Sequence, residues 1–217
     1  MTEDSRTFEA PGEAFVAALS AASVLATSAV KLSTLESVRV EVDGATCTVV
    51  ATDSFSLVAA DVGLGEAVER GAWNLRLDAA TLRVLAAAVK ATRGPVKTRS
   101  GPAIITIAGE YASIEVGGSK VTTTIDNSTY PSWRPLFGPA AVALAEPISF
   151  SPERLGHLVA ISKASRQFLS AMDRNVAATI TSAQGPRKPF TFEWPGRDGM
   201  APSVRFLLMP MRSNQTN

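Results

Sequence analysis

The amino-acid sequence predicts an α+β protein built from a repeated unit. Two observations support this. A pattern of one short strand, one amphipathic helix and two or three further strands occurs three times along the 217 residues. Hydrophobic residues make up 46% of the chain and charged residues 19%, which is enough apolar material for a sizeable core. Aromatic residues are only 6%, so Ala, Val, Leu and Ile must form most of that core.

The first copy of the unit contains the clearest strand pattern. Val38–Val42 alternates apolar and polar residues as a half-buried strand does, and Asp43-Gly44 is typical of a hairpin turn. The predicted elements, in chain order, are a strand Thr7–Ala10, a helix from about Gly12 to Ser28, and strands Val38–Val42, Thr46–Val50 and Phe55–Val62.

The second copy has well-marked ends to its helix. Asp78 is a good N-cap, and Gly94-Pro95 stops the helix. Gly109-Glu110 and Gly117-Gly118 predict two turns. The predicted elements are a strand Trp73–Leu77, a helix Ala79–Thr92, and strands Ile104–Ala108, Ala112–Val116 and Lys120–Ile125.

The third copy follows a joint at Asn127–Pro139, which is rich in proline and aromatic residues. Pro152 suits the first turn of a helix. The predicted elements are a strand Ile148–Phe150, a helix from Pro152 to about Met172, and strands Val176–Thr181, Pro189–Trp194 and Val204–Met209. We therefore expect two parts, residues 1–138 with two copies and residues 139–217 with one.

Composition and termini exclude several classes. The 21 basic and 20 acidic residues give a net charge of +1, which excludes a strongly basic protein that coats nucleic acid but not a local basic face. The single Cys47 cannot form an internal disulfide. Met1–Phe8 is polar, unlike a signal peptide, and Ala14–Val30 is interrupted by Ser and Thr. We expect a cytoplasmic protein with no membrane partner.

No pattern in the sequence predicts catalysis. There is no phosphate-binding loop, GxSxG, HExxH or paired CxxC motif. Asp53 and Ser54 have no histidine nearby in the sequence. His157 is the single histidine, so a His-rich metal site is excluded, and an ordinary, partly buried histidine is the favoured interpretation. We predict no catalytic residue, no metal and no cofactor; the chain is not expected to be an enzyme.

Basic residues gather on the predicted helices. Arg83, Lys90 and Arg93 fall on one helical face at i, i+7 and i+10, opposite a row of apolar residues. Lys163 and Arg166 share a face of the third helix, and Lys31 lies just beyond the first. For each helix alone a solvated face is the favoured interpretation. The alternative is sequence-independent contact with phosphates.

The C-terminal strand also has two interpretations. An apolar segment from Val204 that ends in Met209-Pro210-Met211 fits an edge strand that finishes in a core. It also fits an adaptable apolar surface that binds a partner's peptide.

Four segments together resemble the bacterial DNA polymerase III beta subunit, the replicative sliding clamp. They are VATDSFSL at 50–57, YASIEVGGSKVTTTIDNSTYPSWRPLF at 111–137, PISFSPERLGHLVAISKASR at 147–166 and FLLMPMR at 206–212. The resemblance implies a DNA-clamp fold of repeated βαβββ half-domains, with helices on one face of antiparallel sheets. Residues 1–138 would match the middle domain of the clamp, and 139–217 a shortened C-terminal half-domain that ends in MPMR.

The resemblance also implies a function and partners. The chain would be a sliding-clamp-like processivity factor that encircles or contacts duplex DNA without reading its sequence. DNA polymerase, other proteins with a clamp-binding motif and a clamp loader would be its partners. A ring of twelve half-domains would need four chains, so a homo-oligomer, a tetramer or trimer, is expected. The alternative is a non-ring clamp paralogue that acts as a decoy or regulatory interaction module.

The resemblance assigns two sets of site residues. The chain departs from the family in two places. The family commonly has Gly at the position of Ser54, an aromatic residue or His at that of Phe55, and Arg at that of Ser56. At the C-terminus, the usual motif is followed here by Ser213–Asn217. The partner-peptide pocket would use Leu35, Thr52, Leu57, Phe137, Met209, Pro210, Met211 and Arg212. The DNA-facing residues would be Lys31, Arg83, Lys90, Arg93, Lys163 and Arg166.

Overall fold

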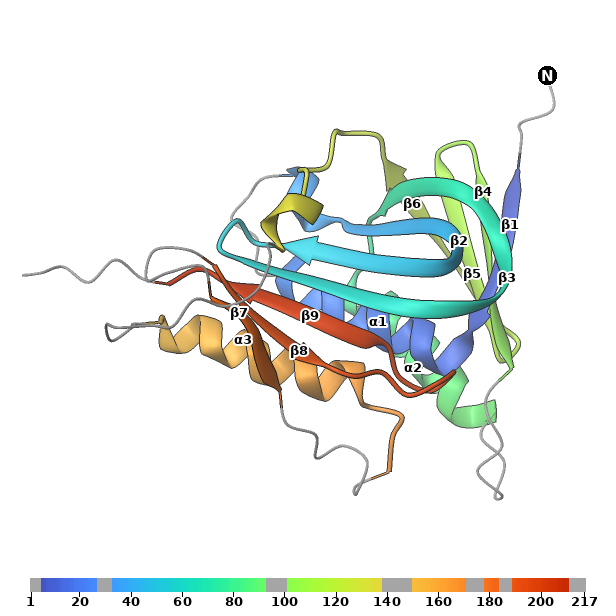
Figure 1. Cartoon of the computed structure of the whole chain (residues 1–217). Helices are drawn as coiled ribbons and strands as arrows, with labels where there is room; N and C mark the ends of the chain where they lie inside the picture. The colour runs from blue at the N-terminus through green and yellow to red at the C-terminus, as the bar shows by residue number, and fades with distance from the viewer. Residues whose placement is uncertain are drawn as a thin grey trace, which may run out of the picture.

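The computed structural model describes residues 5–26, 33–92, 101–137, 150–170, 178–183 and 189–210. Within these ranges three α-helices lie along one side of a strongly curved antiparallel sheet (Figure 1). This confirms the predicted α+β class. The helices are α1 (Gly12–Ala26), α2 (Ala79–Thr92) and α3 (Pro152–Ser165). The strands are β1 (Arg6–Pro11), β2 (Val38–Thr52), β3 (Ser56–Leu75), β4 (Pro102–Ala108), β5 (Tyr111–Val116), β6 (Ser119–Asp126), β7 (Thr179–Ala183), β8 (Phe190–Trp194) and β9 (Ser203–Leu208).

One sheet joins the N-terminal and C-terminal parts of the chain. Its strand order is β1-β4-β5-β6-β3-β9-β8-β7, with β2 paired to β3 outside this path. The pairing of β3 with β9 sets Ser56 opposite Leu208 and Asp61 opposite Ser203. Main-chain pairing therefore runs across the predicted boundary near residue 138, and the division of the chain into two parts stays a prediction.

The long β2–β3 hairpin differs from the sequence prediction. The turn predicted at Asp43-Gly44 is wrong, because β2 continues through it and the register with β3 shifts on either side of Gly44. Gly44 has φ +59°, so it takes a left-handed conformation within the strand, and at both register shifts the extra residues belong to β3. The chain instead reverses at residues 53–55. The predicted strands Phe55–Val62 and Trp73–Leu77 are accordingly parts of the single strand β3.

The second copy follows its prediction closely. The Asp78 carboxylate accepts a hydrogen bond from the Thr81 amide at 2.6 Å and so caps α2. Gly109 and Gly117 take left-handed conformations in the turns that separate β4, β5 and β6. In the third copy α3 ends at Ser165, earlier than predicted, and most of the predicted strand Ile148–Phe150 lies outside the described residues.

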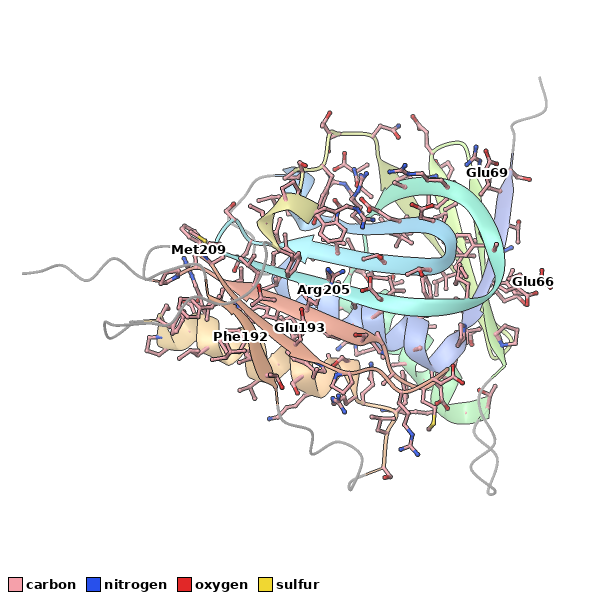
Figure 2. The ribbon with its side chains drawn as sticks, in the orientation of Figure 1. Glu66, Glu69, Phe192, Glu193, Arg205 and Met209 are labelled. Carbon is pink, nitrogen blue, oxygen red and sulfur yellow. The ribbon has the colours of Figure 1, made fainter. Side chains whose placement is uncertain are left out.

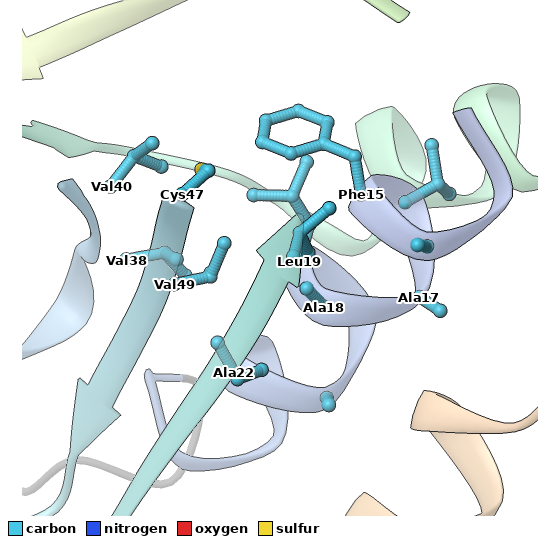
Figure 3. Packing of buried hydrophobic residues seen from close by; sticks show 14 of the residues in the cluster. Phe15, Ala17, Ala18, Leu19, Ala22, Val38, Val40, Cys47 and Val49 are labelled. Atoms are coloured by element: carbon cyan, nitrogen blue, oxygen red, sulfur yellow. The ribbon is translucent and has the colours of Figure 1, made fainter. Parts of the chain in front are cut away.

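Helix α1 is the centre of the main core. Only Ser20 and Val24 of its residues are partly exposed, so the prediction that this helix is amphipathic is wrong. Its many alanines allow α2 and α3 to pack closely against it. Figure 3 shows Phe15 and Leu19 on the side of α1 that faces Val40, Cys47 and Val49 of β2. Exposed helical surface therefore comes from α2 and α3.

Candidate functional site

A second apolar cluster lies on the face of the sheet that is opposite α1. Along β2, β3 and β9 successive side chains point to opposite faces, so Val49, Val58 and Phe206 enter the main core while their neighbours face outward. We call the outward group the outer cluster. It comprises Val50, Leu57, Ala59, Tyr130, Trp133 and Leu207, with the partly buried Phe137 and Met209 packed against it.

The proline- and aromatic-rich joint covers this face. Trp133 is 3% exposed, and Phe137 packs edge-on against its ring with the centroids 6.0 Å apart. Tyr130 is also buried, and burial raises the pKa of its phenol far above the usual value. Its hydroxyl therefore stays protonated at neutral pH, 3.5 Å from the Val50 carbonyl oxygen. The buried rings of Tyr130 and Trp133 thus attach the joint to the sheet.

Hydrogen bonds to the carboxylate of Glu41 attach the joint to β2. The Glu41 carboxylate accepts hydrogen bonds from Arg39 at 2.5 Å, from the Trp133 indole at 3.2 Å and from Arg134 at 2.6 Å. Burial raises the pKa of Glu41, but these three donors outweigh burial, and the net pKa is lowered. The Arg134 guanidinium also lies 4.5 Å from the centre of the Trp133 ring. The ionised carboxylate is the centre of this network.

The turn between β2 and β3 lies at one end of the outer cluster. Asp53 accepts hydrogen bonds from the amides of Phe55 at 2.9 Å and Ser56 at 2.6 Å. The Thr52 hydroxyl donates to the Ser56 carbonyl at 2.8 Å, and Ser54 has φ +77°. Thr52 and Asp53 therefore fit this turn, whereas Ser54 takes a left-handed conformation that favours glycine.

Helix α3 contacts the same turn from the other side. Arg154 lies 3.6 Å from the centre of the Phe55 ring, and His157 Nδ1 lies 3.5 Å from Asp53 Oδ2. The fold brings a histidine to Asp53 that is distant in sequence. The Phe55 carbonyl also accepts a hydrogen bond from the Met209 amide at 3.0 Å, which fixes the C-terminal strand beside the turn.

The structure brings together part of the predicted peptide pocket. Leu57, Phe137 and Met209 meet in the outer cluster. Thr52 is buried in the adjoining turn, and Pro210 is partly buried directly after Met209. Leu35 is buried near the start of β2 but is not a member of the outer cluster. Met211 and Arg212 lie outside the described residues.

Sequence reasoning missed the residues that form the floor of this surface. Val50 and Leu207 are buried beneath the joint, and Tyr130 and Trp133 supply most of its aromatic area. The sequence predicts the YPSW segment as a joint but does not name the strands that it covers. The available signal is the run of consecutive apolar residues at Val49-Val50-Ala51 and Leu57-Val58-Ala59, which is typical of strands buried on both faces.

Of the predicted DNA-facing residues, three are exposed on helices, two lie outside the described residues, and one, Arg166, is buried. Arg83 and Lys90 are exposed on α2, on the side opposite Leu82 and Leu85, and Lys163 is exposed on α3. Lys31 and Arg93 lie outside the described residues.

Arg166 requires a correction. It is only 4% exposed, it follows the last residue of α3, and it donates a hydrogen bond to the Pro195 carbonyl at 2.8 Å. Burial lowers the pKa of its guanidinium. Because the chain leaves the helix at this point, the helical spacing from Lys163 does not hold, and Arg166 does not share its exposed face.

The described residues offer neither a metal site nor a reactive thiol. They contain no group of three His, Cys, Asp or Glu side chains that could hold a metal ion. Burial, with a further contribution from Asp61, raises the pKa of the Cys47 thiol to about 12, so this thiol stays protonated. None of the described helices has the length and apolar character needed to cross a membrane.

Comparison with known proteins identifies the fold. No protein-family model and no curated protein match the sequence. Among solved structures, the chain is similar to the DNA polymerase sliding clamp of Bacillus subtilis, with a TM-score of 0.63 and 13% identity over 98% of this chain and 66% of the other. It is also similar to the DNA polymerase III subunit beta of Pseudomonas aeruginosa, with a TM-score of 0.60 and 13% identity over 96% and 65%.

A third similar structure is the DNA polymerase III beta subunit of Thermotoga maritima, with a TM-score of 0.58 and 13% identity over 95% of this chain and 65% of the other. The chain therefore has the sliding-clamp fold, as its sequence motifs predict. It spans about two thirds of the length of these clamp chains.

Proposed function

We propose that this chain is a sliding-clamp-like processivity factor, a non-catalytic protein that holds DNA polymerase or other partners on duplex DNA. One observation carries the proposal. The exposed cations Arg83, Lys90 and Lys163 lie on the helical side of the sheet, whereas the outer cluster lies on the opposite side. Two ligands could therefore bind at once without competing for the same surface.

The helical side suits loose contact with DNA. Three exposed cations on two helices, within a chain of net charge +1, provide few phosphate contacts. Such binding is independent of base sequence and weakens steeply with salt. The slope of the logarithm of the binding constant against the logarithm of the salt concentration becomes more negative by about 0.9 for each phosphate neutralised. DNA held in this way is free to slide, and lasting attachment would come from several chains closing around the duplex.

The outer cluster suits an apolar peptide. Phe137 and Met209 are partly exposed above the buried Leu57 and Trp133. Phe55, next to Met209, is 45% exposed. An unbranched methionine adapts to different apolar partners. We propose that leucine and phenylalanine side chains of a polymerase or another clamp-binding protein insert here.

Ring closure would need more than one copy of the chain. Because the chain spans two thirds of the solved clamp chains, we propose a homo-oligomer, a tetramer or a trimer, that a clamp loader places on DNA. β7 lies at one end of the strand order and β1 at the other, so the ends of the sheet are available for contacts between copies.

Charge reversal on the two sides of the sheet tests the DNA interface. We expect Lys90→Glu with Lys163→Glu to weaken binding to a 30-base-pair duplex at least tenfold at low salt, measured by fluorescence anisotropy. The matched control, Arg70→Glu with Lys120→Glu, makes the same change in charge at exposed positions on β3 and β6 rather than on a helix. Equal loss of affinity in both variants would remove the helical side as the DNA interface.

A non-ring interaction module is the second candidate. The observation that favours it is the small number of exposed cations on α2 and α3, combined with an outer cluster that faces away from them. Analytical ultracentrifugation separates the two candidates. A trimer or tetramer that stays longer on nicked circular DNA than on linear DNA supports the clamp. A monomer at micromolar concentration that still binds a leucine- and phenylalanine-containing peptide supports the module.

A further inference from the structure

A large groove separates β1 from the middle of β3. Its volume is about 990 Å³, and every residue of β1, from Arg6 to Pro11, lines it. β1 pairs with β4 through all six of its residues. Among the described residues no strand pairs with its other edge. The edge of β1 that does not pair with β4 therefore borders the groove, where Arg6, Thr7 and Glu9 are exposed and Phe8 and Ala10 are buried.

The irregular course of β3 opens the groove. Thr46 pairs with Gly63 and Gly44 with Val68, so residues 64–67 of β3 have no partner on β2. This bulged stretch contributes to the far wall of the groove. At one end Arg6 bridges the two walls, because its guanidinium donates a hydrogen bond to the Arg70 carbonyl at 3.2 Å.

An aromatic pair lies within the groove. Phe8 on β1 stacks on Trp73 on β3 with the ring centroids 6.1 Å apart. A Cβ atom at Gly71 would lie 2.3 Å from the Trp73 ring, so glycine is needed at that position for the ring to lie where it does. The partly exposed Trp73 and Pro11 give the groove apolar surface, whereas Phe8 is buried beneath it.

The rim of the groove is acidic. Among the described residues, Glu9, Glu66 and Glu69 line it, and Arg6 is the one cationic residue that does so. Arg6 already lies 3.6 Å from Glu69, so carboxylates remain in excess. Figure 2 shows Glu66 and Glu69 at the bend of β3, at the opposite end of the molecule from Met209.

We propose that this groove binds an extended, lysine- or arginine-containing segment of a partner protein, which adds to the free edge of β1 as a further strand. Main-chain hydrogen bonds to β1 would supply affinity, and alternate basic side chains would meet the carboxylates of the rim. The six residues of β1 span about 20 Å, which a segment of six to eight residues matches. This site is separate from the DNA-facing helical side and from the outer cluster, but it includes the β1 edge that could otherwise contact a second copy.

Binding of a defined probe tests the charge complementarity. The probe is a fluorescein-labelled octapeptide of alternating lysine and valine, and the control probe has glutamate in place of lysine. We expect the basic probe to bind and the acidic probe not to bind. Glu66→Lys with Glu69→Lys should weaken binding at least tenfold. Glu110→Lys with Glu115→Lys makes the same change in charge at exposed residues outside the groove and should change affinity less than twofold.

Amide hydrogen exchange tests the strand addition itself. In an antiparallel pair only alternate amides of a strand face a given neighbour, so the probe should protect alternate amides of β1. Equal weakening in both charge variants, or binding without this protection, would overturn the proposal in favour of general charge attraction. Protection that appears without probe, and rises with protein concentration as the mass doubles, would overturn it in favour of a second copy. None of these outcomes depends on DNA binding or on the outer cluster.

Discussion

The two apolar clusters on opposite faces of the β2–β3–β9 sheet are built in different ways. On the inner face α1 seals the main core, and Phe15 and Leu19 have no exposed surface. On the outer face only the joint that contains Trp133 covers the strands, and Phe137 and Met209 remain partly exposed. The same strands thus serve stability on one side and present a binding surface on the other. Changes on the inner face should cost stability, and changes on the outer face should cost binding.

The largest expected effect is on the inner face. Leu19→Ala should lower the free energy of unfolding by about 3 kcal/mol, because it removes a fully buried side chain and leaves a cavity beside the sheet. Urea denaturation followed by circular dichroism measures this change. Leu136→Ala is the matched control, because Leu136 is 47% exposed, and should cost less than about 0.5 kcal/mol. Similar costs for the two variants would contradict the distinction between the faces.

The next largest effect concerns the attachment of the joint. Glu41→Gln should cost about 1 to 2 kcal/mol at neutral pH, because the hydrogen bonds from Arg39, Trp133 and Arg134 lose their charged acceptor. The outer cluster should loosen, with greater exposure of Trp133 to a fluorescence quencher. An unchanged quenching rate would show that the aromatic anchors hold the joint without the carboxylate.

The same variant should show a distinct pH dependence. The folded-state pKa of Glu41 lies below the ordinary glutamate value of 4.5, so ionised Glu41 stabilises the fold fully above that pH. This stabilisation is lost as the pH falls through the folded-state pKa. The difference in unfolding free energy between wild type and Glu41→Gln should therefore shrink below about pH 4.5. A constant difference down to pH 3 would contradict this role for the carboxylate.

A smaller effect on stability is expected at the exposed part of the outer cluster. Met209→Ala should cost about 1 kcal/mol, because Met209 is only partly buried, yet weaken binding of a leucine- and phenylalanine-containing peptide about tenfold. Isothermal titration calorimetry measures the affinity. Met200→Ala, at another partly exposed methionine, should leave the affinity unchanged. Unchanged affinity in the Met209 variant would exclude the outer cluster as the binding surface.

The sequence predicts those parts of the fold that local chemistry determines. The cap at Asp78 and the glycine turns at Gly109 and Gly117 follow from side-chain and backbone preferences within a few residues, and the structure confirms them. The Asp43-Gly44 turn is predicted by the same reasoning and is wrong, because a left-handed glycine also occurs here within a strand whose partner carries the extra residues. The pairing of β2 with β3 on both sides of Gly44 decides between these two possibilities.

The candidate site shows the same limit. The joint was visible in the sequence, but its contacts with Val50 and Leu207 depend on the pairing of β3 with β9, which joins segments that are more than a hundred residues apart. The proximity of His157 to Asp53 likewise joins two residues that are far apart in the sequence. In the other direction, Arg166 was assigned by helical spacing to a face that the chain has already left.

The smallest effects on stability separate Lys163 from Arg166 on the helical side. Arg166→Ala should cost about 1 kcal/mol, because it removes a nearly buried guanidinium that donates to the Pro195 carbonyl. Lys163→Ala should change stability by less than about 0.5 kcal/mol, since the side chain is exposed, but lower the affinity for duplex DNA and reduce the salt slope by about 0.9. Thermal unfolding and anisotropy titrations at several salt concentrations measure the two effects. If Arg166→Ala lowered the salt slope by the same amount at unchanged stability, its guanidinium would be a DNA contact after all, and the helical side would extend beyond the end of α3.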